Sequence, residues 1–195
     1  MTWVKTTIQE TSSTKSCSNR MDPFLVHVAV LRRVIGTSVR EVLVGPFDPE
    51  GDLGPTALST SRIVEDAEMT MEILLQSASR SITLTGTASA PWSGLCSRCA
   101  MEVSGELTVP LDELFVEKLG DDDDVYRIVD DAIDVGPAGR EALIVGLPLL
   151  PLCRPDCAGL CPSCGIDRNE ETCACEAPKD DRWSALDGLS SLGEG

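Results

Sequence analysis

Two apolar runs rich in β-branched residues lie in the first quarter of the chain. They are Leu25–Leu31 and Val39–Val44, and Gly36 lies between them. Val and Ile side chains pack well on a pleated surface, so these runs predict two strands joined by a turn at the glycine. The glycines and prolines between residues 45 and 55 predict a long loop after them.

Two later segments, Ile82–Thr87 and Val103–Val109, alternate between apolar and polar residues. A period of two places the apolar side chains on one face of a strand, which predicts two half-buried antiparallel strands. Cys96 and Cys99 lie between these segments, near Gly94. The first cysteine pair is therefore expected at the turn of a hairpin.

The segment Pro137–Val145 has the pattern of a helix, with proline at the start and Gly146 after its end. The apolar segment Leu147–Leu152 then predicts an extended connector to Cys153. Together these elements predict an α+β fold, with an antiparallel β-sheet body, one main helix and a small zinc-ribbon-like C-terminal module.

The predicted organisation has three parts. Residues 1–20, rich in Ser and Thr, are expected to form a disordered leader; residues 21–152 form the β-rich body with the hairpin knuckle and the helix; residues 153–195 form a cysteine-rich zinc-binding module. Residues 1–20 lack the apolar run of a secretory signal, and the apolar stretch Ala142–Cys153 is too short to span a bilayer. We therefore expect a cytoplasmic protein without membrane contact.

The charge distribution narrows the range of partners. The 195-residue chain has a net charge of -16, of which -12 falls in residues 63–135. The run Asp121–Asp124 predicts a solvated loop, because adjacent like charges repel in a regular element. Binding to phosphate backbones requires a local excess of Lys and Arg, so the composition argues against nonspecific binding of nucleic acid or anionic lipid.

The cysteines carry the strongest chemical signal. Of nine cysteines, eight form four close pairs, whereas Cys17 is isolated near the N-terminus and is expected to be a free thiol. A short spacer lets two thiolates bind the same cation, and a second pair completes a tetrahedron. The sequence therefore predicts two Zn²⁺ sites of four cysteines each, formed by Cys96, Cys99, Cys153, Cys157, Cys161, Cys164, Cys173 and Cys175.

The grouping of the pairs follows from their proximity along the chain. Cys161 and Cys164, followed by Gly165, are expected to join Cys173 and Cys175 in one site, which leaves Cys96, Cys99, Cys153 and Cys157 for the other. A different sharing of Cys157 and Cys161 between the sites remains open. Iron–sulfur ligation remains an alternative, while disulfides and a redox C-x-x-C pair are less favoured, because no export signal and no βαβ context accompany the cysteines.

Candidate catalytic residues are lacking. His27, the only histidine, lies in an apolar run and is expected to be a buried strand residue. The sequence contains no phosphate-binding glycine loop and no nucleophile paired with a base. We therefore predict a protein that is not an enzyme and has no small-molecule substrate.

The order of these motifs resembles one known family. The motifs are the C-x-R-C hairpin, the apolar connector to Cys153, Cys157-Ala-Gly-Leu-Cys161-Pro-Ser-Cys164-Gly, Asn169, Cys173-x-Cys175 and a terminal Asp181-Arg182-Trp183-Ser184-Ala185-Leu186. Residues 21–192 are thereby similar to the bacterial and plastid domain of unknown function 177, the YceD-like large ribosomal RNA subunit accumulation proteins. The resemblance implies a role in accumulation of the large-subunit ribosomal RNA and in ribosome assembly, without a known enzymatic activity.

The acidity suggests which partners such a factor would bind. Residues 153–195 contain four basic and nine acidic residues, so we expect docking to basic ribosomal or assembly proteins. If ribosomal RNA is contacted directly, the candidate residues are Arg32, Arg33, Arg40, Arg62 and Arg98. Trp183, Leu186 and Leu189 have helical spacing and are expected to fold back on the domain. The alternative function is a thiol-based redox protein or a zinc-linked redox sensor.

Overall fold

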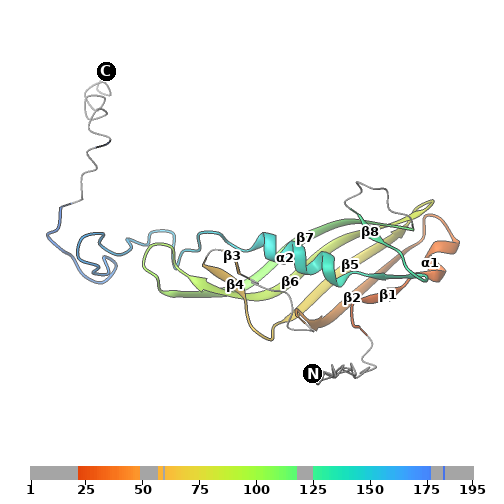
Figure 1. The fold of residues 1–195 in the computed structure, drawn as a ribbon, viewed down its shortest axis with the longest axis horizontal. Coiled ribbons are helices and arrows are strands. Elements are labelled where there is room, and N and C mark those ends of the chain that lie inside the picture. Colours follow the sequence, from red (N-terminus) through yellow and green to blue (C-terminus); the bar gives the residue numbers. More distant parts are fainter. Residues whose placement is uncertain (1–21, 49–56, 59, 118–124, 177–181, 183–195) are drawn as a thin grey trace, which may run out of the picture.

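The computed structural model describes residues 22–48, 57, 58, 60–117, 125–176 and 182 (Figure 1). The predicted leader, the run Asp121–Asp124, most of the loop after residue 48 and the motif at Trp183 lie outside these residues. The described elements, in chain order, are β1 (Leu25–His27), α1 (Ala29–Arg33), β2 (Ser38–Pro46), β3 (Ala57–Leu58), β4 (Ser61–Ile63), β5 (Glu68–Ser77), β6 (Ser81–Leu95), β7 (Glu102–Val116), β8 (Tyr126–Arg127), β9 (Ala132–Asp134) and α2 (Gly136–Gly146).

A seven-stranded, mostly antiparallel sheet forms the body of the protein. Strands β2, β5, β6 and β7 lie side by side in this order, and the only parallel pair in the described sheet is β7 with β8. Strand β4 continues the edge of β6 beyond β5, pairing Ile63 with Trp92 and Ser61 with Gly94. Strands β1 and β9 form a separate antiparallel pair. The predicted α+β class, with an antiparallel body and one main helix, is confirmed.

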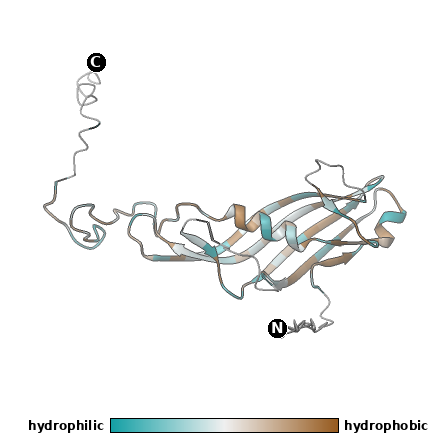
Figure 2. Ribbon diagram, viewed as in Figure 1, coloured by the Kyte–Doolittle hydropathy of each residue, from teal (hydrophilic) through white to brown (hydrophobic). Residues whose placement is uncertain are grey.

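The core lies on one face of the sheet. The burial of β5 alternates strictly, and Met69, Met71, Ile73 and Leu75 are all buried. Hydrophobic and hydrophilic residues alternate along the long strands (Figure 2). Because one side of each strand is apolar, the sheet must be covered on that side to remove its hydrocarbon from water.

Helix α2 covers that face. Ala138 and Leu143 are buried against the sheet, and Gly139 lies so close to it that a Cβ atom there would be 2.9 Å from the sulfurs of Met69 and Met71. Residues without bulky side chains allow this close approach. The helix predicted over Pro137–Val145 is confirmed, with the proline in its first turn. Neither described helix has the length and apolar character needed to cross a bilayer.

Two expectations near the N-terminus are wrong in part. The run Leu25–Leu31 is a strand only to His27, and α1 begins at Ala29. The buried residues Phe24, Val28 and Leu31 are four and three positions apart, which is helical spacing and explains the change of element. His27 lies on a strand as predicted, but it is exposed because its neighbours Val26 and Val28 turn toward the core.

The expected loop also starts later than predicted. Strand β2 pairs with β5 as far as Pro46, so Gly45 belongs to the sheet rather than to the loop. Its lack of a side chain has a structural reason, since a Cβ atom there would be 2.4 Å from Cγ of Pro23 and 3.0 Å from the Phe24 ring. The turn at Gly36 is confirmed, with a φ of 84° that favours glycine.

Candidate metal centres

The hairpin β6–β7 positions the first cysteine pair. The two strands pair without interruption from Ser81 opposite Val116 to Leu95 opposite Glu102. Cys96 and Cys99 follow at the turn, at one end of the molecule, where the chain that leaves α2 meets the hairpin (Figure 1). The backbone N–H of Ser97 donates to the carbonyl of Pro151 at 2.8 Å, which fixes the connector beside the hairpin.

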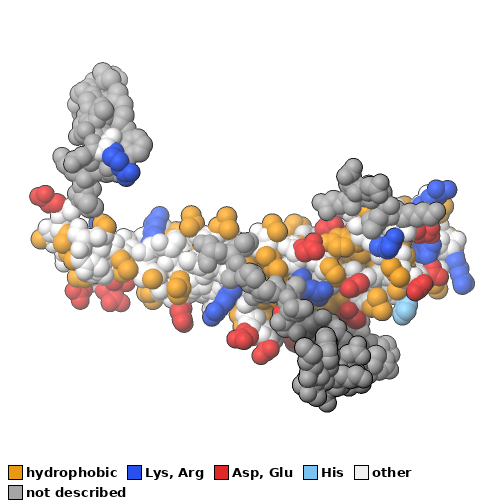
Figure 3. All heavy atoms as spheres, in the orientation of Figure 1, with side chains coloured by type: hydrophobic (Ala, Val, Ile, Leu, Met, Phe, Trp, Pro, Cys, Tyr) orange, Lys and Arg blue, Asp and Glu red, His pale blue; other side chains and the backbone are white. Residues whose placement is uncertain are grey.

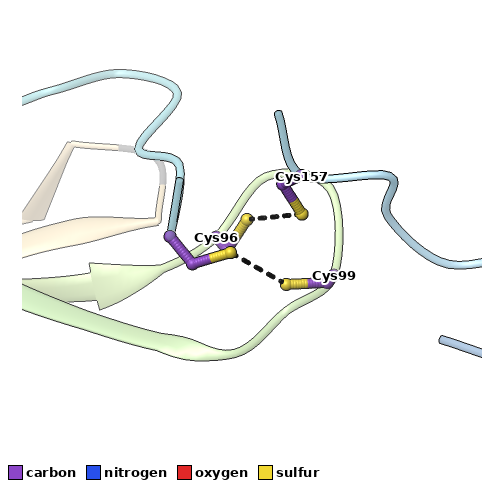
Figure 4. A group of neighbouring side chains, drawn as sticks. Cys96, Cys99 and Cys157 are labelled. Carbon is purple, nitrogen blue, oxygen red and sulfur yellow. Dashed lines mark hydrogen bonds between the residues drawn. The ribbon is translucent and has the colours of Figure 1, made fainter. Parts of the chain in front are cut away.

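The first cluster consists of Cys96, Cys99, Cys153 and Cys157, whose sulfurs all lie within 4.8 Å of one another. The Sγ atoms of Cys96 and Cys157 are 3.8 Å apart, and those of Cys99 and Cys153 are 3.6 Å apart. Figure 4 shows the side chains of Cys96, Cys99 and Cys157 converging on one point. All but Cys153 are buried, which shields this cluster from solvent.

The second cluster consists of Cys161, Cys164, Cys173 and Cys175, whose sulfurs also lie within 4.8 Å of one another. Cys161 is buried, Cys173 is half-buried, and Cys164 and Cys175 are exposed. The eight cysteines thus gather in the two groups expected from their order along the chain, and the alternative sharing of Cys157 and Cys161 is not observed. The second cluster is the more exposed of the two.

The two C-x-x-C pairs have the same backbone geometry. In the first, the Cys96 N–H donates to the Met101 carbonyl at 2.8 Å, and the Ala100 N–H donates to the Cys96 carbonyl at 2.9 Å. The second repeats both bonds, from the Cys161 N–H to the Ile166 carbonyl and from the Gly165 N–H to the Cys161 carbonyl. Ala100 and Gly165 both have positive φ, 58° and 75°. The chain therefore contains two knuckles with the same hydrogen bonds, each of which could bind a metal ion.

The geometry of the donors in the first cluster fits a single tetrahedral ion. Four sulfurs that surround one Zn²⁺ at about 2.3 Å are about 3.8 Å apart, which matches the spacing in the first cluster. Four thiolates and no open position are typical of a structural site rather than a catalytic one. Each cluster could thus hold one metal ion, with cysteine sulfur as the only ligand type.

Backbone N–H groups stabilise one thiolate in each knuckle. Hydrogen bonds from the backbone of Cys153, and then of Cys99 and Arg98, lower the pKa of Cys96 to about 6 despite its burial. The N–H groups of Cys164 and Ser163 lower the pKa of Cys161 to about 6. The first cysteine of each knuckle is thus a thiolate at neutral pH even without a metal, which favours cation binding.

The remaining thiols include two that hold their protons firmly. Desolvation of the sulfur within the cluster, followed by the neighbouring cysteines, raises the pKa of Cys153 to about 12, although the residue as a whole is exposed. Hydrogen bonding with Cys164, followed by desolvation, raises the pKa of Cys175 to about 12. Four thiolates cannot share so small a volume without a cation to neutralise them, so each empty cluster retains protons that a metal must displace.

Two residues that are not cysteines, Arg98 and Asn169, connect the clusters. The sequence did not predict this role for either of them. The Arg98 guanidinium donates to the Cys157 carbonyl at 2.8 Å, and the Arg98 carbonyl accepts from the Leu160 N–H at 2.9 Å. Asn169 donates from Nδ2 to the sulfur of Cys157 at 3.4 Å. The position of Asn169 between Cys164 and Cys173 in the sequence was the available signal.

The arginines considered for RNA contact have different environments. Arg32 forms ion pairs with Glu117 and Asp131, so its charge is already neutralised. Arg33, Arg40 and Arg62 are exposed, and no acidic residue in the described part of the chain forms an ion pair with them. Arg98 is exposed but fixed to the first cluster. The structure does not gather these side chains into one basic surface around the clusters.

A family model described as "Large ribosomal RNA subunit accumulation protein YceD" matches residues 84–190, more than half of the chain. The matched region contains both long strands of the hairpin in large part, helix α2 and all eight clustered cysteines. The region before residue 84, with β1 to β5, lies outside the match.

Individual relatives come from mycobacteria. Uncharacterized proteins of Mycobacterium bovis and Mycobacterium tuberculosis are 36% identical over 130 residues, which cover 64% of this chain and 63% of each relative. An uncharacterized protein of Mycobacterium leprae is 33% identical over 105 residues, covering 51% of this chain and 48% of the relative. The chain thus spans less than two thirds of these relatives. No solved structure matches it.

Proposed function

The chain belongs to the YceD family of large ribosomal RNA subunit accumulation proteins, and we propose that it supports accumulation of that RNA and assembly of the large ribosomal subunit as a non-catalytic binding factor. The match over residues 84–190 carries this proposal, because it includes every cysteine of both clusters. The factor would act in the cytoplasm, where ribosomes are assembled.

Zinc is the metal we propose for both clusters. The sulfurs in the first cluster are 3.6 and 3.8 Å apart, a spacing that suits one ion and is too narrow for ligands that surround a multi-iron cluster. An all-thiolate tetrahedral donor set favours Zn²⁺ over harder divalent cations. Its role would be to hold the chain after Cys153 in place.

We propose basic ribosomal or assembly proteins as the direct partners. Acidic side chains lie along the visible face of the molecule, including the end that carries the cysteines (Figure 3), where Asp156, Glu170, Glu171 and Glu176 are exposed. Each site of four thiolates and one Zn²⁺ would add about two negative charges. Complementary charge speeds the encounter with a basic protein and disfavours a bare phosphate backbone.

Depletion of the protein tests the role in assembly. We expect large-subunit ribosomal RNA to fall relative to small-subunit RNA, and large-subunit precursors to accumulate in sucrose gradients. Re-expression of the wild-type chain should restore the ratio, whereas the Cys161→Ser/Cys164→Ser variant, which removes a knuckle, should not. Normal gradients after complete depletion would exclude the proposed role.

Binding across a range of salt concentrations tests the choice of partner. The purified, zinc-loaded chain should bind basic large-subunit proteins, and naked ribosomal RNA only weakly. A tight RNA complex that forms without any protein, and that loosens steeply with salt, would contradict protein docking and favour Arg33, Arg40 and Arg62 as phosphate contacts.

The exposure of the second cluster favours one alternative, a zinc-linked redox sensor. Cys164 and Cys175 are exposed, and the lowered pKa of Cys161 makes one sulfur of that cluster a thiolate in the absence of metal. Mild peroxide should then release zinc from the second cluster before the first. Inert thiols and about two zinc ions per chain after such treatment would favour the structural role.

A further inference from the structure

The loop of the second cluster reaches the first cluster through a single side chain. Asn169 lies between Cys164 and Cys173, so its loop is closed at both ends by the second cluster. Its Nδ2 group nevertheless donates to Sγ of Cys157, a member of the first cluster, at 3.4 Å. Its Oδ1 atom accepts from the Ala158 N–H and from the Arg154 guanidinium, both at 2.7 Å.

Other contacts hold Asn169 in this orientation. Asp167 accepts from the Asn169 N–H at 2.9 Å and from its Nδ2 group at 2.6 Å. The Arg168 N–H donates to the Gly159 carbonyl at 2.9 Å, and Leu160 forms a β-bridge with Asp167. The loop therefore lies against the short segment that joins Cys157 to Cys161.

From these contacts we propose that Asn169 is a positioning residue that couples the two metal centres, so that metal in the second cluster tightens metal binding in the first. The proposal rests on the metal binding proposed above. A hydrogen bond to a ligating thiolate withdraws negative charge from the sulfur and fixes its direction, and such outer partners affect metal affinity strongly.

The coupling follows from the topology of the loop. Without metal, hydrogen bonds hold the loop between Cys164 and Cys173 against the segment from Cys157 to Cys161, and ordering it costs conformational entropy. Metal in the second cluster closes the loop and orders Asn169 before the first cluster is filled. Because coupling between binding sites is reciprocal, metal in the first cluster must favour the second to the same extent.

An exchange that keeps the total charge of the chain tests the proposed contact. In the Asp167→Asn/Asn169→Asp variant the side chains at the two positions can still hydrogen-bond to each other, and an oxygen remains to accept from Ala158 and Arg154. The N–H directed at Cys157 is replaced by a carboxylate oxygen, so the donor is lost and a negative charge is placed beside that sulfur. Glu170→Gln, at an exposed neighbouring position, serves as the matched control.

Metal affinities are measured on the reduced full-length chain by competition with a chromophoric chelator, and ¹¹³Cd NMR assigns each resonance to a cluster. We expect the exchange variant to bind metal at the first cluster about 10- to 100-fold more weakly and to shift only the ¹¹³Cd resonance of that cluster. The Glu170→Gln chain should match the wild type in both. A change confined to overall stability, with an unmoved resonance, would overturn the positioning role.

A double-mutant cycle tests the coupling itself. Cys173→Ser/Cys175→Ser empties the second cluster and should weaken the first about 10- to 100-fold in the wild-type background, but have little further effect in the exchange variant. Equal losses in both backgrounds, or no loss in either, would overturn coupling through Asn169 while leaving two metal centres. Failure of the wild-type chain to bind any metal would instead overturn the centres and, with them, the coupling.

Discussion

Ala100 occupies a backbone conformation that the second knuckle gives to glycine. Its φ is 58°, against 75° for Gly165, and the hydrogen bonds around the two positions are the same. A left-handed conformation costs a residue with a Cβ atom roughly 1–2 kcal/mol. The first knuckle therefore carries local strain that the second avoids.

Replacing Ala100 with glycine and Gly165 with alanine should change the stability of the protein in opposite directions. Ala100→Gly should stabilise the zinc-loaded protein by up to about 1 kcal/mol, because relief of the strain exceeds the added entropy of the unfolded chain. Gly165→Ala should destabilise it by about 1 kcal/mol, since a Cβ atom there meets nothing within 4 Å and only the backbone is strained. Thermal unfolding at fixed zinc activity measures both. A stabilising effect of Gly165→Ala would contradict the expected backbone strain at that position.

The uneven pKa values of the thiols predict how many protons zinc displaces. Cys96 and Cys161 have a pKa of about 6, so at pH 7.5 both are already thiolates in the reduced metal-free protein, whereas Cys153 and Cys175, near 12, are protonated. Zinc binding should therefore release about three protons or fewer per site at pH 7.5. As the pH falls below 6, the number of protons released per site should approach about four. The affinity for zinc should fall, because every thiol must then lose its proton before it can bind the metal.

Proton release can be followed with a pH indicator in weakly buffered solution during titration with zinc. The Cys96→Ser/Cys161→Ser chain is the control, because it lacks both low-pKa sulfurs. A release of four protons per site at both pH values would contradict the lowered pKa of the first cysteine in each knuckle.

For individual residues, the sequence indicated the candidate metal ligands but not the side chains that hydrogen-bond around them. Paired spacing identified the eight cysteines, the short distance in sequence between Cys164 and Cys173 indicated one group, and the other group followed as the remainder. The roles of Arg98 and Asn169 depend on how the loops meet, and nothing local in the sequence specifies that. The exposure of His27 likewise depends on where β1 ends and α1 begins.

Among the elements, α2 depends on glycines at its contact with the sheet. A Cβ atom on Gly146 would be 2.4 Å from Cγ1 of Val109, which is buried and stiff. A Cβ atom on Gly139 would instead meet the sulfur atoms of Met69 and Met71 at 2.9 Å, and these side chains are flexible. The two glycines therefore differ in how well their surroundings can adapt.

We expect Gly146→Ala to destabilise the protein by about 1–3 kcal/mol, because Val109 or the end of the helix must shift. Gly139→Ala should lie within about 1 kcal/mol of the wild type, since its helix propensity offsets a contact that the methionines can relax. Urea unfolding of both variants, with metal content verified, provides the comparison. A larger loss for Gly139→Ala would mean that the methionines are held rigidly.

The elements were predictable where their pattern was long and regular. The hairpin of β6 and β7 and the helix α2 follow from alternation and from the proline start. Strand β5 was not predicted, although Met69, Met71, Ile73 and Leu75 alternate with polar or half-buried positions. The short α1 was missed because five residues carry too little periodicity, and its helical form depends on burying Leu31 in the core.

For the whole molecule, the sequence indicated the fold class but not the order of strands. Pairing of β4 with the far end of β6, and of β1 with β9, joins segments that are far apart in the chain. Such pairings are set by the shared core and not by local patterns. The neutralisation of Arg32 by Glu117 and Asp131 is of the same kind, because these residues meet only after the fold is complete.

The two ends of the molecule should differ in their dependence on metal. The main hydrophobic core contains residues of the sheet, α1, β9 and α2, whereas the separate cluster of buried residues at the hairpin turn consists of Cys96, Cys99 and Cys157, with Val103 packed against it. Removal of zinc would leave that end of the described chain with almost no apolar contacts to hold it. The sheet body should keep its core without metal, because no cysteine belongs to that core.

Hydrogen exchange of the reduced protein, with and without a chelator, tests this difference. Chelation should remove protection from the N–H groups of Leu160, Cys161, Gly165 and Arg168, which are hydrogen-bonded only near the clusters, while the amides that join β5 to β6 keep theirs. Zinc added back should restore the lost protection. Unfolding of the sheet on chelation would mean that metal supports the entire fold. Unchanged protection at Leu160, Cys161, Gly165 and Arg168 would mean that metal does not hold this end of the described chain in place.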